Sequence, residues 1–376
     1  MSPKAEKELM QRIEVLPETH QDTFRRALRN ILSSDVAEHT CAQILDGLPT
    51  EQSYLEGYVR LEGHPVFELG HTEMCQGFLD KAREFRDRFD PSELVLKENA
   101  IVLPQANRMT RGQLLSAFRD TVPGSHDFNL RLIELVVVAC HQIAAYLFEL
   151  DDGVHKHEVY DSWMQQQLME SVLQSRPGKA KSMYNIPPAA FFHLSYVYPD
   201  QYPRGVADVA GYWAEGKIFG GVVVFDRGET EQECKAMWIH GARLRGPRTL
   251  YPPTQDQFDS LVKFLLARPG EDAPCPLPIY GTPENRPRWH PYHALAKYHI
   301  FRDKYERQPG PEPPKTGHRG PAPADWPEMA DYYIAFFPDL IRNNGGTLSD
   351  QDIADARARL AEATPSSPFW YPLVSN

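Results

Sequence analysis

The stretch Gly220-Gly-Val-Val-Val-Phe-Asp-Arg-Gly228 carries the clearest strand signal in the chain. Its centre, Val222 to Phe225, is β-branched and aromatic, and turn-forming residues bound it on both sides. Two further short runs, Met237 to His240 and Arg248 to Tyr251, follow with a glycine-containing connection between them. We therefore expect a small antiparallel sheet built on this stretch.

Helices are expected on either side of these strands. The pattern from Gly205 through Trp213 is helical and stops at Gly220. Downstream, Thr254 and Gln257 have the spacing of a capping box, which predicts a helix that ends before Pro269 and covers the sheet. The apolar face of that second helix is formed by Phe258, Leu261, Val262, Leu265 and Leu266.

The first part of the chain is helical in pattern. Glu6 to Val15, Gln21 to Leu32 and Gln76 to Phe89 have amphipathic periodicity. The most apolar window, Ile133 to Leu150, contains two glutamates and is too polar for a bilayer span, so it predicts a buried core helix.

The ends of that core helix also have sequence signals. Asp127 and Asn129 are candidate N-terminal caps, and Gly153 is the candidate stop. Asp151 and Asp152 then lie at a helix C-terminus, where the helix dipole disfavours negative charge.

The predicted fold class is α+β, with a mainly helical N-terminal half packed on a small antiparallel sheet and its covering helix. The polar stretch from Gln166 to Lys181 is interpreted as a loop or short frayed helix between regions. We predict a mainly helical region at 1–165, an α+β region sharing its core at 182–306, a proline-rich linker at 307–323, and a C-terminal helical appendage at 324–376.

Three more helices complete the prediction. Tyr292 to Arg307 follows a proline-rich extended segment, and Met329 to Ile341 and Ser349 to Ala363 follow the linker. The C-terminal pair is expected to be tethered to the rest of the chain by the linker.

Charge and cysteine content restrict the partners and the compartment. The chain has 376 residues and a net charge of -11, which repels phosphate backbones and anionic lipid, so neither nucleic acid nor membrane is expected as a partner. The N-terminus lacks the apolar stretch of a signal peptide, and a cytoplasmic location is expected. The five scattered cysteines, which form no C-x-x-C pair, are expected to be reduced thiols: Cys41, Cys75, Cys140, Cys234 and Cys275.

Three stretches of the chain have a recognisable pattern and run from Ile101 to Arg111, from Leu147 to His157, and from Phe219 to Glu229. They resemble a large family of uncharacterised proteins from filamentous fungi. The resemblance implies a fungal source and a cytoplasmic protein, and it implies no reaction.

Acidic residues and histidines are densest just after the core helix. Asp151, Asp152, His155 and His157 combine hard carboxylate oxygens with imidazoles, a set that can bind a divalent metal ion. The two histidines would point the same way if Val154 to Val159 is extended. The alternative is a solvated helix terminus with ordinary surface charges, a group to which Glu158 and Asp161 also belong.

A second acidic group follows the best strand and comprises Asp226, Glu229, Glu231 and Glu233. Rigid strand ends can hold catalytic groups steady, but the same residues suit a hairpin turn with its acids facing water. As catalytic candidates we take Asp152, His157, Asp226 and Glu229. The hypothesis is that the turns containing Asp152 and Asp226 face one another across a shared pocket.

The same acids are similar to the two magnesium motifs of class I terpene cyclases, which hold a diphosphate through metal ions. Three departures weaken this resemblance: Phe225 and Glu229 do not match the second motif, the motifs are close in sequence, and the second lies on a predicted strand.

Reserve candidates are His290, His293 and His299 as ligands or bases, and a basic loop that could bind a carboxylate or phosphate, formed by Arg243, Arg245 and Arg248. The chain contains no nucleophile elbow, phosphate loop, dinucleotide fingerprint or H-E-x-x-H helix.

The leading hypothesis is a small-molecule enzyme of fungal metabolism, specialised metabolism included, that acts with or without a divalent metal ion. The alternative is a non-catalytic binding or regulatory protein that presents its acidic turns and proline-rich segments to partners.

Overall fold

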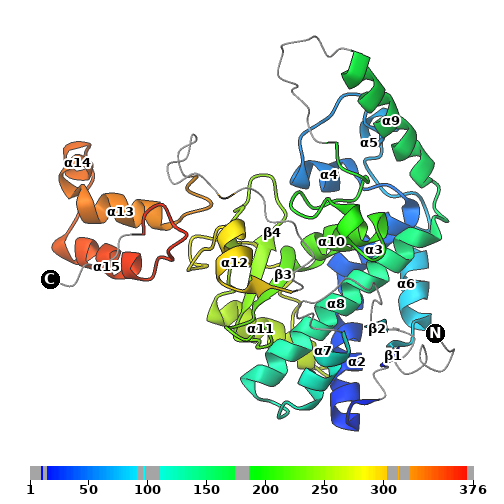
Figure 1. The fold of residues 1–376 in the computed structure, drawn as a ribbon, viewed down its shortest axis with the longest axis horizontal. Coiled ribbons are helices and arrows are strands. Elements are labelled where there is room, and N and C mark those ends of the chain that lie inside the picture. The colour runs from blue at the N-terminus through cyan, green and yellow to red at the C-terminus, as the bar shows by residue number, and fades with distance from the viewer. Residues whose placement is uncertain are drawn as a thin grey trace.

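The computed structural model describes residues 10–11, 15–91, 96–97, 111–173, 186–302, 312 and 322–370. Most of the described chain is helical, and a four-stranded antiparallel sheet lies among the helices (Figure 1). The predicted α+β fold is confirmed.

Helix α8, His126–Leu150, is the centre of the helical region. Its N-cap is Ser125, whose Oγ accepts from the Phe128 backbone N–H at 3.1 Å, and its C-cap is Asp151 in the left-handed conformation. The predicted caps at Asp127 and Asn129 and the predicted stop at Gly153 were thus misplaced by a few residues. Within the described residues α8 alone is long and apolar enough to cross a membrane, and 94% of its most apolar window is buried inside the protein.

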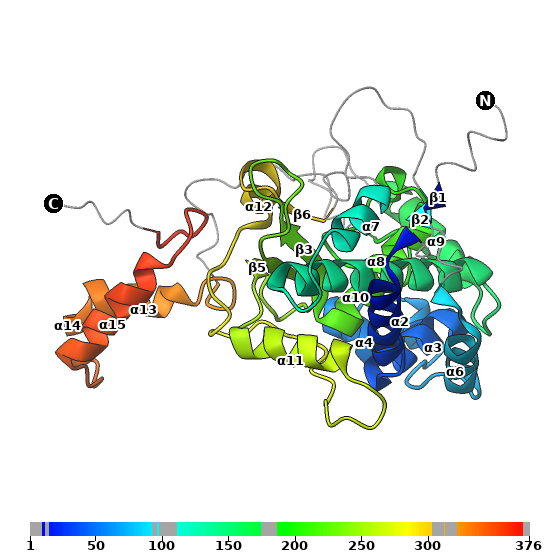
Figure 2. The same ribbon diagram turned by 90° about the horizontal axis from the view of Figure 1, so that it is seen from below.

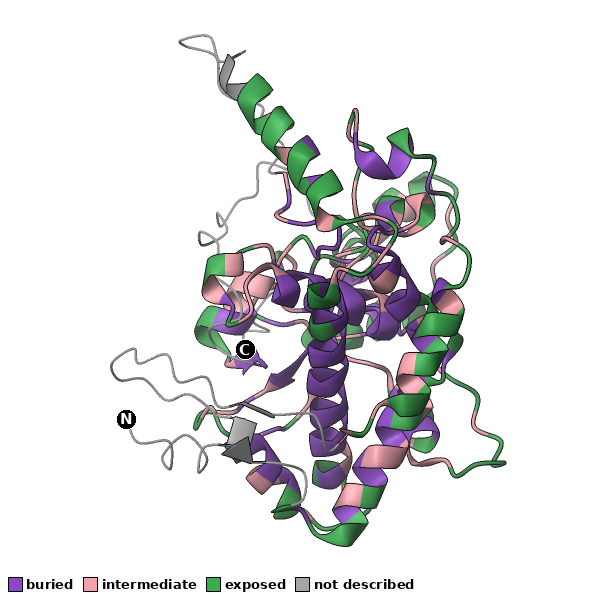
Figure 3. Cartoon of the chain, turned by 90° about the vertical axis from the view of Figure 1, so that its right-hand side faces the viewer, coloured by how far each residue is buried: buried purple, intermediate pink, exposed green. Residues whose placement is uncertain are grey.

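Helices α2 (Glu18–Leu32), α3 (Asp35–Asp46) and α10 (Val206–Phe219) pack against α8. Helix α6 (Phe78–Arg88) packs against α3, and α7 (Arg111–Arg119) against α8. The predicted helices at Gln21 to Leu32 and Gln76 to Phe89 are confirmed. In Figure 3 the helices at the centre of the molecule are buried along their length.

The predicted helix from Glu6 to Val15 is wrong at its centre. Met10–Gln11 is strand β1, which pairs antiparallel with β2, Leu96–Lys97. Most of the remaining expected helix lies outside the described residues. A partner more than eighty positions away decides the conformation here, and local periodicity cannot show such a partner.

The sheet has the order β5-β4-β3-β6, from β3 (Gly221–Asp226), β4 (Met237–Gly241), β5 (Leu250–Tyr251) and β6 (Ile300–Phe301). In register, Val223 pairs with Ile239 and Ile239 with Tyr251. Helix α11, Gln255–Leu266, begins with the predicted capping box and contributes Leu261 to the core that contains these residues. The predicted sheet and its covering helix are confirmed.

Two helices differ in extent from the simplest interpretation of the sequence. Helix α9, His157–Leu173, continues through the first half of the stretch interpreted as a loop or short frayed helix, and its buried Tyr160 and Trp163 contact His64. Much of α9 is nevertheless exposed (Figure 3). Helix α12, Pro291–Lys297, is shorter than predicted because the chain turns at His299, which has a positive φ, and then pairs with β3 as strand β6.

The C-terminal helices are α13 (Glu328–Phe336), α14 (Pro338–Asn343) and α15 (Asp350–Ala361). Pro338 divides the helix that was predicted from Met329 to Ile341, because proline cannot continue a helical hydrogen-bond ladder. These helices lie to one side of the sheet in both views (Figures 1 and 2). They are bonded to the segment that precedes α12 through Asp331, which contacts Arg286, and Thr364, which donates to the Arg288 carbonyl at 2.5 Å. Most of the predicted linker at 307–323 lies outside the described residues.

Candidate metal centre

Four side chains from three separate segments converge on one point. Asp46 ends α3, His71 and Cys75 lie in the connection before α6, and His155 lies between α8 and α9. Each offers one ligand atom, and these atoms all lie within 4.8 Å of one another. Asp46 and His71 are buried, whereas Cys75 and His155 are partly exposed. We call these four residues the metal centre.

The carboxylate of Asp46 occupies an electrostatically unfavourable position. Its side chain is fully buried, at the C-terminus of α3, where the helix dipole disfavours negative charge. The helix ends here because Gly47 adopts the left-handed conformation, with φ of 98°. A buried anion at this place requires a positive partner.

Two glycines allow the segments to meet. The His155 N–H donates to the Asp46 carbonyl at 3.0 Å. A Cβ atom on Gly47 would lie 1.6 Å from the His155 carbonyl oxygen, and one on Gly153 would lie 2.4 Å from the Asp46 carbonyl oxygen. The backbones therefore approach so closely that only glycine fits at either position.

His71 is held in one orientation by its two ring nitrogens. Nδ1 is 2.9 Å from the Pro49 carbonyl oxygen, which can only accept, so Nδ1 carries a proton and donates. Nε2 is 3.1 Å from Asp46 Oδ2. This contact with a carboxylate is favourable only if Nε2 carries a second proton or if its lone pair binds a cation. A histidine ligand whose other nitrogen donates to a carbonyl is the usual arrangement in metal sites.

Cys75 and His155 complete the centre. Cys75 Sγ is 3.5 Å from His155 Nε2, close to the edge of about 3.6 Å that a tetrahedral zinc ion imposes on a sulfur and a nitrogen ligand. The Cys75 N–H donates to Asp46 Oδ2 at 2.7 Å. The other carboxylate oxygen, Asp46 Oδ1, is buried and has no hydrogen-bond partner among the described residues. An unpartnered buried anionic oxygen is what a bound cation would satisfy.

The pKa values of the four residues are shifted by their surroundings in the centre when no ion is bound. Burial alone would raise the pKa of Asp46, but hydrogen bonds from His71 and Cys75 outweigh it and lower the pKa. Burial opposes protonation of His71, yet its hydrogen bonds to Asp46 and Pro49 raise the pKa. Burial, followed by Asp46, raises the pKa of Cys75, and burial lowers that of His155. Cys75 is then a thiol beside a neutral imidazole, not the thiolate that a cysteine nucleophile requires.

Of the predicted metal ligands, only His155 belongs to this centre. Asp151 Oδ1 instead accepts from the His157 N–H at 3.1 Å, where α9 begins. The His157 ring stacks on Phe148 with centroids 3.8 Å apart, and Asp152 is exposed. The expected extended run was wrong because α9 starts at His157, which turns the two histidines apart. Glu158 and Asp161 are exposed on α9.

The acidic group after β3 forms a turn. Asp226 Oδ1 accepts from the Gly228 N–H at 2.8 Å, Glu229 is exposed, and Glu233 pairs with Lys235 at 2.8 Å. Glu231 has a positive φ in the same turn. This is the hairpin-turn alternative that the sequence left open.

The two acidic turns do not face one another. The turn after β3 is bonded to the first half of α8, because Arg131 donates to the Gln232 carbonyl at 2.7 Å and Arg227 pairs with Glu134 at 2.6 Å. Asp151 caps the other end of α8, about 25 Å from Glu134 at 1.5 Å per residue. The hypothesis of a pocket shared by Asp152 and Asp226 was therefore wrong, and the terpene-cyclase arrangement, which needs both acidic motifs across one cavity, is not formed.

The reserve histidines have local partners. His290 Nδ1 accepts from the Tyr292 N–H at 3.1 Å and caps α12. His293 Nδ1 is 2.9 Å from Ser366 Oγ, and His299 Nδ1 donates to the Gly228 carbonyl at 2.8 Å. These contacts are typical of histidines that fix loops.

The sequence contained one signal for this candidate centre. His71 and Cys75 are separated by three residues in a polar turn, a spacing that lets two soft or borderline ligands reach one ion. Asp46 carries no comparable signal, because its burial follows from the packing of α3 and not from its neighbours in the sequence.

No family model matches this chain, and no curated protein or solved structure is detectably similar to it. The fungal family expected from three stretches of sequence therefore stays a prediction. The function has to be inferred from the centre itself.

Proposed function

We propose that this protein binds one divalent transition-metal ion of the zinc class through Asp46, His71, Cys75 and His155. The observation that supports the proposal is the convergence of four ligand atoms within 4.8 Å, with two of the residues buried. Surface acids gather without an ion in many proteins, but a buried carboxylate with two imidazoles and a thiol is a different environment.

The chemistry of the donors favours zinc over magnesium or calcium. Imidazole and thiolate are borderline and soft ligands, whereas magnesium and calcium require mostly oxygen. With Cys75 as thiolate and Asp46 ionised, the ligands carry two negative charges, so a divalent ion makes the centre neutral. Neutrality removes most of the cost of burying Asp46 beside the helix terminus.

Four protein ligands occupy all the coordination positions of a tetrahedral ion, and such closed sites are structural in most zinc proteins. The ion would join the end of α3, the segment before α6 and the connection between α8 and α9. These segments lie far apart in the sequence, so binding would contribute directly to folding. The small-molecule enzyme hypothesis then requires a separate pocket, or displacement of one ligand by water.

Neighbouring histidines provide a matched test. His155→Ala should abolish zinc that copurifies in a one-to-one ratio, whereas His157→Ala should retain it, because His157 stacks on Phe148 outside the centre. Metal content of protein purified without chelator is the measurement. Equal zinc in both variants, or no metal in the unaltered protein after titration with zinc, contradicts the proposal.

A cobalt spectrum tests the sulfur ligand. Cobalt(II) should replace zinc and give the visible bands of a tetrahedral ion together with a thiolate charge-transfer band. Cys75→Ser should remove the charge-transfer band, while Cys41→Ser, at a buried thiol outside the centre, should leave it unchanged. An octahedral spectrum would rule out the assigned ligands.

A further inference from the structure

A cavity of about 450 Å³ lies between the end of β4 and the start of the C-terminal helical unit. One wall is the loop that contains Arg243 and Arg245, which follows β4, and another contains Tyr251 and Tyr280. The remaining wall belongs to the C-terminal segment, through Pro323 and Pro327. A space of this size accommodates a small molecule.

The arginines of this cavity differ from several others in the described part of the chain. Arg227, Arg286 and Arg302 pair with carboxylates. Arg243 and Arg245 have no ion pair with any residue in the described part of the chain, although both line the cavity. The Arg243 guanidinium instead lies over the Tyr280 ring, 4.6 Å from its centroid. Its hydrogen-bond donors are therefore available to an anion.

A further positive charge lies behind the cavity wall that contains Tyr251. Arg288 is buried, and its guanidinium lies 5.1 Å from the centroid of the Tyr251 ring. It donates to the Thr282 carbonyl at 2.6 Å, and its Nε and Nη1 have no hydrogen-bond partner among the described residues. Burial lowers the pKa of Arg288 to about 10, which still leaves it charged at neutral pH. Arg288 thus adds a buried positive charge behind the cavity wall that contains Tyr251.

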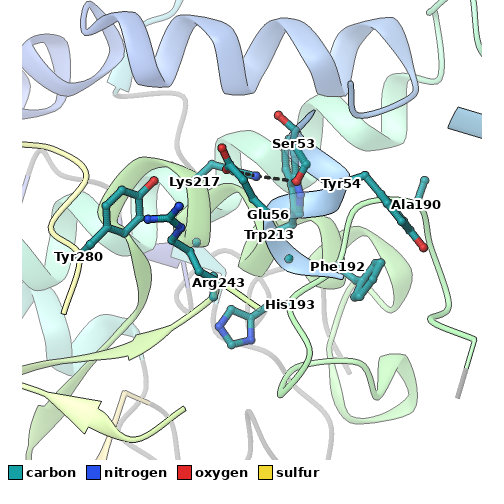
Figure 4. A pocket seen from close by; sticks show the side chains of 13 residues that line it. Ser53, Tyr54, Glu56, Ala190, Phe192, His193, Trp213, Lys217, Arg243 and Tyr280 are labelled. Atoms are coloured by element: carbon teal, nitrogen blue, oxygen red, sulfur yellow. Dashed lines mark hydrogen bonds and ion pairs between the residues drawn. The ribbon is translucent and has the colours of Figure 1, made fainter. Parts of the chain in front are cut away.

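The basic loop is fixed in position. The Leu244 N–H, between the two arginines, donates to the Glu56 carbonyl at 2.7 Å. Glu56 belongs to α4, Glu51–Gly57, and its carboxylate pairs with Lys217 at 2.8 Å. Figure 4 shows this pair in the small pocket next to the cavity, with Arg243 beside Tyr280. Because Glu56 already neutralises Lys217, it does not cancel the charge of the two arginines.

We propose that this cavity binds a small organic anion with a flat apolar body. The guanidinium groups would hold the anionic group, and the tyrosine rings and prolines would contact the body. Bound there, the molecule touches both the sheet and the C-terminal segment, which are already joined where Thr249 Oγ1 donates to the Asp325 carbonyl at 2.9 Å. The site shares no residue with the metal centre.

A charged probe and its neutral counterpart test the site directly. Naphthoate and naphthamide have nearly the same shape and differ in charge, and their binding to the full chain can be measured by ligand-observed NMR and by calorimetry. Naphthoate should bind about tenfold more tightly than naphthamide, as expected for one charge-assisted contact. Failure of naphthoate to saturate at millimolar concentration, or equal affinity for the two probes, overturns the proposal.

Substitutions locate the binding. Arg243→Gln combined with Arg245→Gln should remove the preference for naphthoate, and Arg248→Gln should retain it, because Arg248 is exposed on the same loop but does not line the cavity. Both variants should unfold at the denaturant concentration of the unaltered protein, which excludes a general loss of structure. If the Arg248 variant loses the preference equally, the arginines act only through net charge and the assigned site is wrong.

Discussion

The metal centre and the turn after β3 both contain acidic residues, but they handle charge in opposite ways. In the turn, Asp226 accepts a hydrogen bond from the nearby Gly228 N–H, and Glu229 faces solvent. In the centre, a single carboxylate, Asp46, is buried and meets side chains from remote segments. The comparison teaches that burial and convergence mark a candidate metal site, whereas local density of acids is also typical of a solvated turn.

The largest effect is expected from removing the partner of the buried carboxylate. His71→Ala should lower the free energy of unfolding by about 3–5 kcal/mol, because it leaves Asp46 charged and unpaired in the interior. Asp226→Asn should change it by less than about 1 kcal/mol, since the amide oxygen can still close the turn. Urea unfolding of both variants measures the difference. Similar losses of unfolding free energy in the two variants would contradict the distinction between the two regions.

A smaller loss of stability is expected when a methyl group is added where two segments of the centre meet and all four ligands are kept. Gly47→Ala should destabilise the protein by about 1–3 kcal/mol and remove zinc, because the added Cβ would meet the His155 carbonyl in a left-handed backbone. Gly77→Ala, also at a positive φ but with open space around it, should cost about 1–2 kcal/mol and retain zinc. Zinc retained by the Gly47 variant would show that the close approach does not position the ligands.

The pH dependence of stability is expected to reveal the Asp46–His71 pair in metal-free protein. The lowered pKa of Asp46 gives a contribution that is complete above the ordinary aspartate value and is lost as pH falls through the lowered pKa. The raised pKa of His71 gives a contribution that is complete below 6.5 and is lost as pH rises through the raised pKa. Stability should therefore be greatest between these limits.

With zinc bound, stability should rise with pH in the alkaline range where the metal-free protein loses it. The reason is that the ion replaces the proton on His71 Nε2 and binds better as its ligands deprotonate. Thermal unfolding across the pH series, with and without zinc, tests this expectation. Parallel profiles in the two conditions would mean that the ion does not occupy the position of that proton.

The smallest effect is expected where the metal centre and the anion cavity are connected. The Glu51 N–H at the start of α4 donates to the His71 carbonyl at 2.9 Å, and the Glu56 carbonyl near its end accepts from Leu244 in the basic loop. Removing zinc should weaken naphthoate binding about two- to fivefold, a coupling of about 1 kcal/mol or less. Identical affinities for naphthoate with and without zinc would show that the two sites are not coupled.

The sequence predicted much of the fold but little of the metal centre, for a physical reason. Val222 to Phe225 and the capping box at Thr254 are local patterns, and both formed the elements they indicated. His155 was found because charged residues surround it. Asp46 and Cys75 were not assigned to a site, because only the packing of α3 against its neighbours brings them to His155.

X-ray absorption at the zinc edge tests the central claim most directly. Protein loaded with one equivalent of zinc should show one sulfur neighbour at about 2.3 Å and three nitrogen or oxygen neighbours at about 2.0–2.2 Å, with the outer-shell scattering of two imidazoles. A first shell without sulfur, or one that consists only of oxygen, would contradict a centre made by Asp46, His71, Cys75 and His155.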